Sequence, residues 1–101
     1  MLAPPSVWIT EPQTVKEGER VVLSCSVEGN PLPATVWKKE ETSLLVQDNA
    51  RYSITPTQLI VHRALAADAG KYLCIAVNDY GKAVAETELN VQAISEYKHY
   101  H

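Results

Sequence analysis

The sequence predicts an all-β domain in which two antiparallel sheets pack face to face, and three observations support this. Residues 20–28 alternate between apolar and polar side chains, which is the period of a strand that buries one face. Turn-forming Gly, Pro, Asn and Asp residues interrupt the chain at short intervals, and no long stretch has helical periodicity. Cys25 and Cys74 lie far apart with Trp37 between them, and Tyr72 precedes the second cysteine by two residues; this order is typical of such sandwiches.

The composition indicates one folded domain and excludes some classes of partner. The chain has 101 residues, of which 46% are apolar and 21% charged, as in ordinary globular proteins. The net charge is −3 and the nine basic residues form no run, so we expect no nucleic-acid partner. No apolar stretch is long enough to span a bilayer, and no signal-peptide pattern is present, so we expect no direct membrane contact. We interpret the chain as one module of a longer protein.

The first strand is predicted to be split by a proline. Residues 7–9 predict a short edge strand that ends before Pro12, which cannot donate to a ladder, and residues 15–17 continue it. Within the first part we expect Trp8 to pack inward, in competition with its two apolar neighbours. We divide the chain into a lead-in, a domain and a C-terminal tail or linker, at residues 1–5, 6–92 and 93–101.

The remaining strands follow from alternation and from turn residues. In the alternating segment, Leu23 and Cys25 face inward, and the dense turn residues of 29–33 predict a loop. Residues 64–68 are expected to link two strands with one helical turn, and residues 78–81 predict a hairpin. We expect the further strands at residues 34–39, 44–46, 51–54, 58–62, 71–78 and 83–91.

Taken together, these features resemble the I-set of the immunoglobulin superfamily over roughly residues 5–92. The resemblance implies a Greek-key immunoglobulin-like sandwich with Cys25 and Cys74 bridged between its sheets and Trp37 against them. Leu23 and Leu89 belong to the core that it implies. The sequence itself leaves the redox state open, because the same cysteines would remain a packed thiol pair in the cytosol.

Two further structural roles come from the same resemblance. Tyr72 resembles the residue of a tyrosine corner, whose hydroxyl bonds to the backbone a few residues upstream, near Leu65 or Asp68. Arg51 and Asp68 resemble the ion pair that ties the start of one strand to the loop at the bottom of the sandwich. The alternative for Tyr72 is a buried tyrosine without this contact.

The sequence contains no pattern that predicts catalysis, a cofactor or a metal. No C-x-x-C motif is present, and no histidine lies at ligand spacing from either cysteine. His99 and His101, with Tyr97 and Tyr100, form a weak candidate for a surface metal site, although a solvated tail is the expected state. His62 ends a strand with no nucleophile near it in the sequence pattern. We therefore expect a module that is not an enzyme and that needs no cofactor.

Strand parity predicts an exposed apolar surface on one sheet. If Tyr72 and Cys74 face inward, the residues between and beyond them face outward, and the same rule applies to the two neighbouring strands. The apolar residues sent outward are Val36, Leu73, Ile75, Val77 and Val84, with Lys38, Lys71, Glu86 and Glu88 around them. This set is either a partner surface or ordinary strand composition. Tyr80, at the hairpin tip beside residues 30–33, is a second candidate for recognition.

The expected function is protein–protein recognition within a multi-domain chain. The resemblance implies an adhesion or guidance receptor or the ectodomain of a receptor kinase, on the extracellular side of the plasma membrane. The alternative is an intracellular scaffold associated with muscle or actin. No Asn in the chain begins an Asn-x-Ser/Thr acceptor, which mildly weakens the case for a secreted protein but does not exclude it. The expected partner is a protein: a second copy, a neighbouring immunoglobulin domain or another protein.

Overall fold

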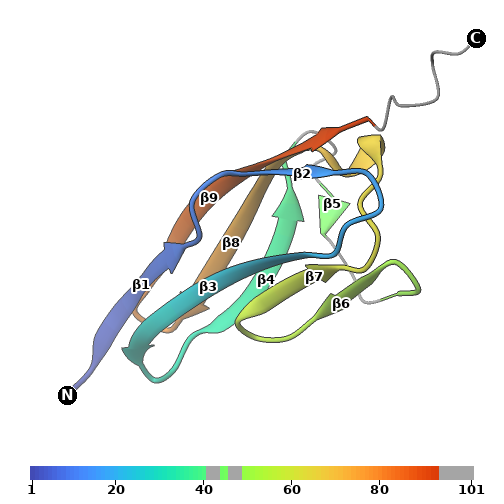
Figure 1. The fold of residues 1–101 in the computed structure, drawn as a ribbon. Helices are drawn as coiled ribbons and strands as arrows, with labels where there is room; N and C mark the ends of the chain where they lie inside the picture. The colour runs from blue at the N-terminus through green and yellow to red at the C-terminus, as the bar shows by residue number, and fades with distance from the viewer. Residues whose placement is uncertain (41–43, 46–48, 94–101) are drawn as a thin grey trace, which may run out of the picture.

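The computed structural model describes residues 1–40, 44–45 and 49–93 (Figure 1). The described residues do not include Val46 or the candidate metal site near the C-terminus, which consists of Tyr97, His99, Tyr100 and His101. The elements within them are β1 (Ala3–Ile9), β2 (Gln13–Lys16), β3 (Val21–Asn30), β4 (Ala34–Lys39), β5 (Leu44–Leu45), β6 (Tyr52–Ile54), β7 (Gln58–Val61), the 3₁₀ turn η1 (Ala66–Asp68), β8 (Gly70–Asn78) and β9 (Gly81–Gln92).

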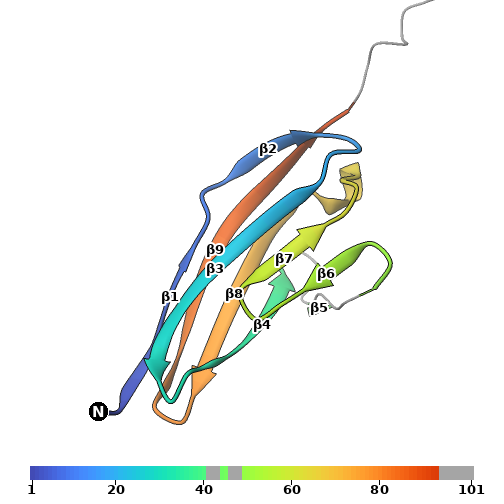
Figure 2. The same ribbon diagram turned by 60° about the horizontal axis from the view of Figure 1, so that its bottom comes forward.

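The strands form two packed layers, which confirms the predicted immunoglobulin-like sandwich (Figure 1). The first sheet has the order β1-β3-β7-β6 and the second has the order β2-β9-β8-β4-β5. All pairs are antiparallel except β2 and β9, which run parallel where β2 lies alongside the end of β9 (Figure 2). The chain changes its neighbouring strand at Pro12: β1 before it pairs with β3 in the first sheet, and β2 after it pairs with β9 in the second.

The first strand differs from the expectation at two points. It begins at Ala3, so part of the expected lead-in already pairs with β3. The expectation that Trp8 packs inward is wrong, because Trp8 is paired with Ser26 on the outer face and is 55% exposed. Its neighbours Val7 and Ile9 lie opposite Val27 and Cys25 and pack against the core.

The core lies between the sheets and contains the residues that alternation placed inward. Leu23, Leu59, Leu89 and Tyr72 are fully buried, and Trp37 is 1% exposed. Burying each such side chain contributes roughly 1.5–3 kcal/mol. The described residues hold no helix long and apolar enough to cross a membrane.

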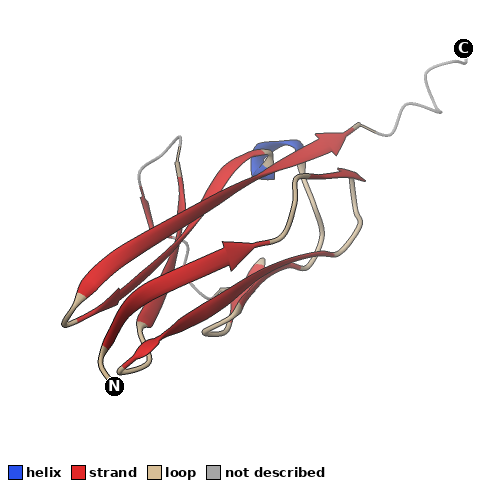
Figure 3. Cartoon of the chain, turned by 90° about the vertical axis from the view of Figure 1, so that its left-hand side faces the viewer, coloured by secondary structure: helices blue, strands red, loops and turns tan. Residues whose placement is uncertain are grey.

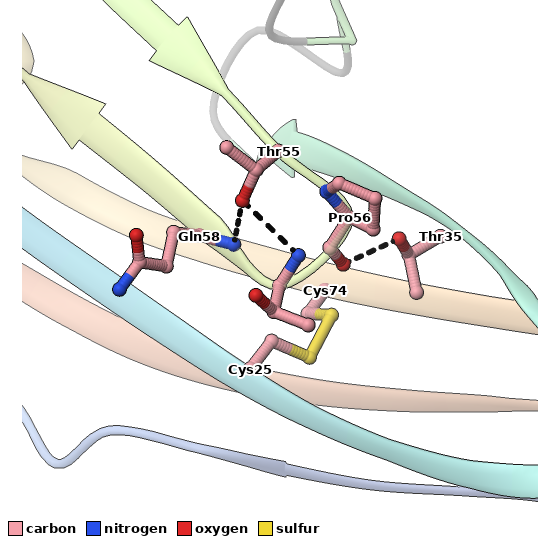
Figure 4. Close-up of a disulfide and its surroundings, with 7 residues drawn as sticks. Cys25, Thr35, Thr55, Pro56, Gln58 and Cys74 are labelled. Carbon is pink, nitrogen blue, oxygen red and sulfur yellow. Dashed lines mark hydrogen bonds between the residues drawn. A yellow bond between two sulfur atoms is a disulfide. The ribbon is translucent and has the colours of Figure 1, made fainter.

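One disulfide joins the two layers. Cys25 of β3 and Cys74 of β8 are bonded, with their Cα atoms 6.5 Å apart (Figure 4). The turn between β6 and β7 lies beside it, where the Thr55 hydroxyl accepts a hydrogen bond from the Gln58 amide at 2.9 Å. Trp37 lies directly opposite Cys74 on the neighbouring strand, in the same core cluster, as the resemblance implies.

Candidate interaction surface

Three neighbouring strands of the second sheet, β4, β8 and β9, carry the outward-facing residues that parity predicted. Their register places one residue from each strand in a common row. Val36 is paired with Ile75, and Ile75 is paired in turn with Val84. Three β-branched side chains therefore form a continuous apolar row across the sheet, since directly opposed side chains lie about 5 Å apart.

Two further rows flank this central row on the same face. On one side Leu73 lies between Lys38 and Glu86, and on the other Val77 lies between Ala34 and Lys82. We call the five apolar residues of the three rows the apolar patch: Val36, Leu73, Ile75, Val77 and Val84. Three of them are 41–48% exposed, whereas Leu73 and Ile75, in the middle strand, are partly buried.

Charged residues of both signs border the apolar patch. Lys38 and Glu86 occupy the two ends of the same row. Lys71 is paired with Glu88 and its ammonium lies 3.8 Å from the Glu86 carboxylate. Both members of that ion pair are about half exposed, at 52% and 54%, so the pair itself contributes little to stability.

The opposite side of the same three strands holds the core, which fixes the orientation of the patch. Tyr72, Cys74 and Ala76 of β8 are fully buried, as are Trp37 of β4 and Leu89 of β9. A register slip by one residue would move all of them to solvent. The patch is therefore presented on a rigid platform rather than on loops.

The predicted tyrosine corner is present at one end of this platform. The Tyr72 hydroxyl donates to the Asp68 carbonyl oxygen at 2.5 Å, across the last residues of η1. Figure 3 shows η1 at the end of the sandwich away from the N-terminus. The corner fixes the start of β8 against the preceding connection and satisfies the polar tip of a buried ring.

The predicted pair of Arg51 and Asp68 is also present and belongs to a larger network. Two guanidinium nitrogens of Arg51 donate to the two carboxylate oxygens of Asp68 at 2.9 and 2.5 Å, and the Tyr52 hydroxyl donates to the same carboxylate at 2.6 Å. Burial alone raises the pKa of the Asp68 carboxyl, but the hydrogen bonds from Arg51 and Tyr52 outweigh it and hold that pKa below its usual value. Burial likewise raises the pKa of the Tyr52 phenol.

At the loop end of the sandwich, the Asn78 side chain joins three segments by hydrogen bonds. From the sequence it was predicted only to belong to a hairpin. Its side-chain amide donates to the carbonyl oxygens of Ala3 and Pro31, both at 2.9 Å. Its side-chain oxygen accepts from the amide of Tyr80 at 2.8 Å, within the turn of the predicted hairpin. An Asn at the start of a tight turn predicts the hydrogen bond to Tyr80. It does not predict the bonds to Ala3 and Pro31, because these acceptors are 75 and 47 residues away in the chain.

Tyr80 itself is 49% exposed at the tip of that hairpin. A shallow groove of about 490 Å³ lies elsewhere, between the start of β4 and the β6–β7 turn. Two of its lining residues are joined by a hydrogen bond, which the Thr35 hydroxyl donates to the Pro56 carbonyl oxygen at 2.7 Å (Figure 4). Leu32, another lining residue, is 77% exposed. The groove is lined by Leu32, Pro33, Ala34, Thr35, Ile54, Thr55 and Pro56, a set with no ionisable side chain.

His62 has a hydroxyl neighbour that the sequence pattern did not reveal. Its Nε2 atom lies 2.7 Å from the Ser53 hydroxyl on the neighbouring strand. The contact is exposed, and neither residue lines the groove described above. Within the described part of the chain, no group of three or more His, Cys, Asp and Glu residues is placed to hold a metal ion.

Curated relatives of the chain are large proteins of which it spans only a small part. It is 38% identical over 92 residues to Protein turtle homolog B of Mus musculus, covering 89% of this chain and 7% of that protein. It is 36% identical over 98 residues to Roundabout homolog 2 of Homo sapiens, covering 88% of this chain and 7% of that protein.

Solved structures with the same fold include domains of two other multi-domain proteins. The titin domains Z1Z2, solved in complex with telethonin, match with a TM-score of 0.86 and 27% identity, over 93% of this chain and 49% of theirs. The tandem Ig repeats of Dlar match with a TM-score of 0.83 and 28% identity, over 93% of this chain and 51% of theirs. The sequence also matches the family model for the immunoglobulin I-set domain over residues 6–91. With its two-sheet sandwich, this match shows that the chain belongs to the immunoglobulin I-set family.

Proposed function

We propose that the chain is a non-catalytic recognition module of an extracellular adhesion or guidance protein, and that it binds a protein partner through the apolar patch. The observation that carries the proposal is the row of Val36, Ile75 and Val84, on a sheet face that the described residues leave exposed and that has charged edges. A contiguous apolar patch with a polar rim is the usual make-up of an interaction site. Relatives such as Protein turtle homolog B and Roundabout homolog 2 support the setting.

The second candidate function is scaffolding inside the cell. The likeness to the titin domains that were solved with telethonin favours it. The bond between Cys25 and Cys74 favours the extracellular setting, because disulfides persist in oxidising compartments and are rare in the cytosol.

The compartment is tested by counting thiols. Material taken from its native source without reduction is expected to contain no free thiol in this domain, because both cysteines are bridged. Two free thiols would instead favour the intracellular scaffold.

The surface is tested by the binding of labelled chain to intact cells of the native tissue, measured by flow cytometry. Ile75→Lys places a charge in the centre of the apolar patch and is expected to reduce binding strongly. Ser26→Lys, an exposed strand position on the outer face of the first sheet, is the matched control and is expected to bind like the parent. Equal loss in both variants, or no loss in either, would contradict a role for the patch.

A further inference from the structure

We propose that the apolar patch binds a second copy of the same chain, about a twofold axis that runs along β8. The proposal rests on the proposed function, because it names the partner of the same surface. It is carried by the order of residues in the three rows, in which apolar residues meet apolar residues and Lys38 meets Glu86 when a row is reversed.

The geometry follows from the symmetry operation. When two copies face each other about an axis along the middle strand, β4 of one lies over β9 of the other, and each row meets its own equivalent in reverse order. In the central row, Val36 then meets Val84 of the second copy, and Ile75 meets its own equivalent on the axis. The same apolar contact is therefore made twice.

The neighbouring row supplies the charge complementarity. Lys38 and Glu86 stand on either side of Leu73, so the reversal brings Lys38 of each copy over Glu86 of the other. Two ion pairs form by symmetry, one on each side of an apolar contact between the two Leu73 side chains. Opposite charges placed in this way fix the register of an interface.

The competing arrangement has its axis across the strands, and the surroundings of the lysines disfavour it. It would pair Glu86 with Lys82 of the second copy and leave Lys38 over Ala34, without a carboxylate. Lys38 is half-buried and has β5 on its other side, so its charge would lose water without gaining a partner. Lys82 is exposed beside the hairpin and stays hydrated when it is the unpaired lysine.

Lys71 is the one charge that the preferred axis places over its own equivalent. It lies two rows from the centre, with Glu88 opposite and Glu86 within 3.8 Å, so the region around it is not net positive.

The self-association is tested by sedimentation equilibrium of the chain over a wide concentration range. The parent is expected to show a molar mass that rises towards the dimer, Ile75→Lys to stay monomeric, and Ser26→Lys to behave like the parent. Val84→Lys, at a 48% exposed position, is a second variant that leaves the partly buried middle strand intact. A parent that is monomeric at every concentration overturns the proposal.

The axis is tested by exchanging charges. Lys38→Glu and Glu86→Lys are each expected to raise the dissociation constant about tenfold or more, and the double variant with both changes is expected to recover most of the loss. If the double variant Glu86→Lys with Lys82→Glu recovers the affinity instead, the twofold axis runs across the strands and this arrangement is overturned.

If the parent is monomeric but Ile75→Lys still abolishes binding to cells, the proposed function stands and only the choice of partner fails.

Discussion

Asp68 is 1% exposed, yet its oxygens accept hydrogen bonds from four different residues. Arg51, just before β6, and Tyr52, its first residue, donate to the Asp68 carboxylate, and the Leu65 amide donates to it at 2.8 Å across η1. Its carbonyl oxygen accepts the Tyr72 hydroxyl. A buried carboxylate is costly unless it is paired and hydrogen-bonded, so these donors explain why an acid is tolerated at this point.

Removing the Tyr72 hydroxyl is expected to destabilise the fold. Tyr72→Phe leaves the ring in the core but takes away the donor to the Asp68 carbonyl, which should lower the free energy of unfolding by about 1–3 kcal/mol. Urea unfolding followed by tryptophan fluorescence measures the change. Tyr80→Phe, at the exposed hairpin tip, is the matched control, and a similar loss there would show that the corner has no special role.

The charge of Asp68 is expected to make stability depend on pH in the acid range. Because the pKa of Asp68 in the folded protein lies below its usual value near 3.8, the stabilisation is complete above that value and is lost as the pH falls through the folded pKa. The difference in unfolding free energy between the parent and Asp68→Asn should therefore be constant near neutrality and narrow below the usual value. Asp79→Asn at the hairpin tip is the control. If the difference in unfolding free energy between the parent and Asp68→Asn stays the same at low pH, the negative charge of Asp68 does not contribute to stability.

At the scale of elements, the sequence pattern predicted which face of most strands is buried, but it did not show which residues of neighbouring strands are paired. Parity was sufficient for β8, although residues 72–77 are all apolar, because Cys74 and Tyr72 had an assigned inward orientation that fixed the rest. It failed for β1, because three apolar residues follow one another and only the pairing with β3 shows that Trp8 faces outward. For the same reason the row of Val36, Ile75 and Val84 required the register, which depends on contacts between distant segments.

Asn78 is expected to hold the start of β1 in place. Asn78→Ala removes the donor to the carbonyls of Ala3 and Pro31, so the amides of Ala3 and Ser6 in β1 and those of the hairpin should exchange with solvent faster. The global free energy of unfolding should fall by only about 1–2 kcal/mol. Hydrogen exchange resolved by residue measures both effects.

Asn90→Ala changes an exposed residue of β9 and is the matched control for this variant. Unchanged exchange in β1 of Asn78→Ala would contradict the proposed anchoring.

At the scale of the whole molecule, the order of a few residues was enough to predict the sandwich. Cysteines in facing sheets with a tryptophan between them in sequence leave few alternatives for a chain of this size. The bridge of Cys25 and Cys74, which spans 49 residues, contributes roughly 4 kcal/mol in the chain-entropy model. The apolar patch then lies on the outer face of a sheet whose inner face is held by this bridge.

The same bridge also limits how far the molecule can lengthen under mechanical load. When the chain is pulled from both ends, force passes directly from one sulfur to the other, and the segment between the cysteines carries none of it. Reduction should therefore add about 160 Å of contour length to each unfolding event in a single-molecule force experiment, the extended length of 49 residues. In an oxidising environment the module would behave as a short, stiff link, so that adjoining parts of a longer protein would take up the strain.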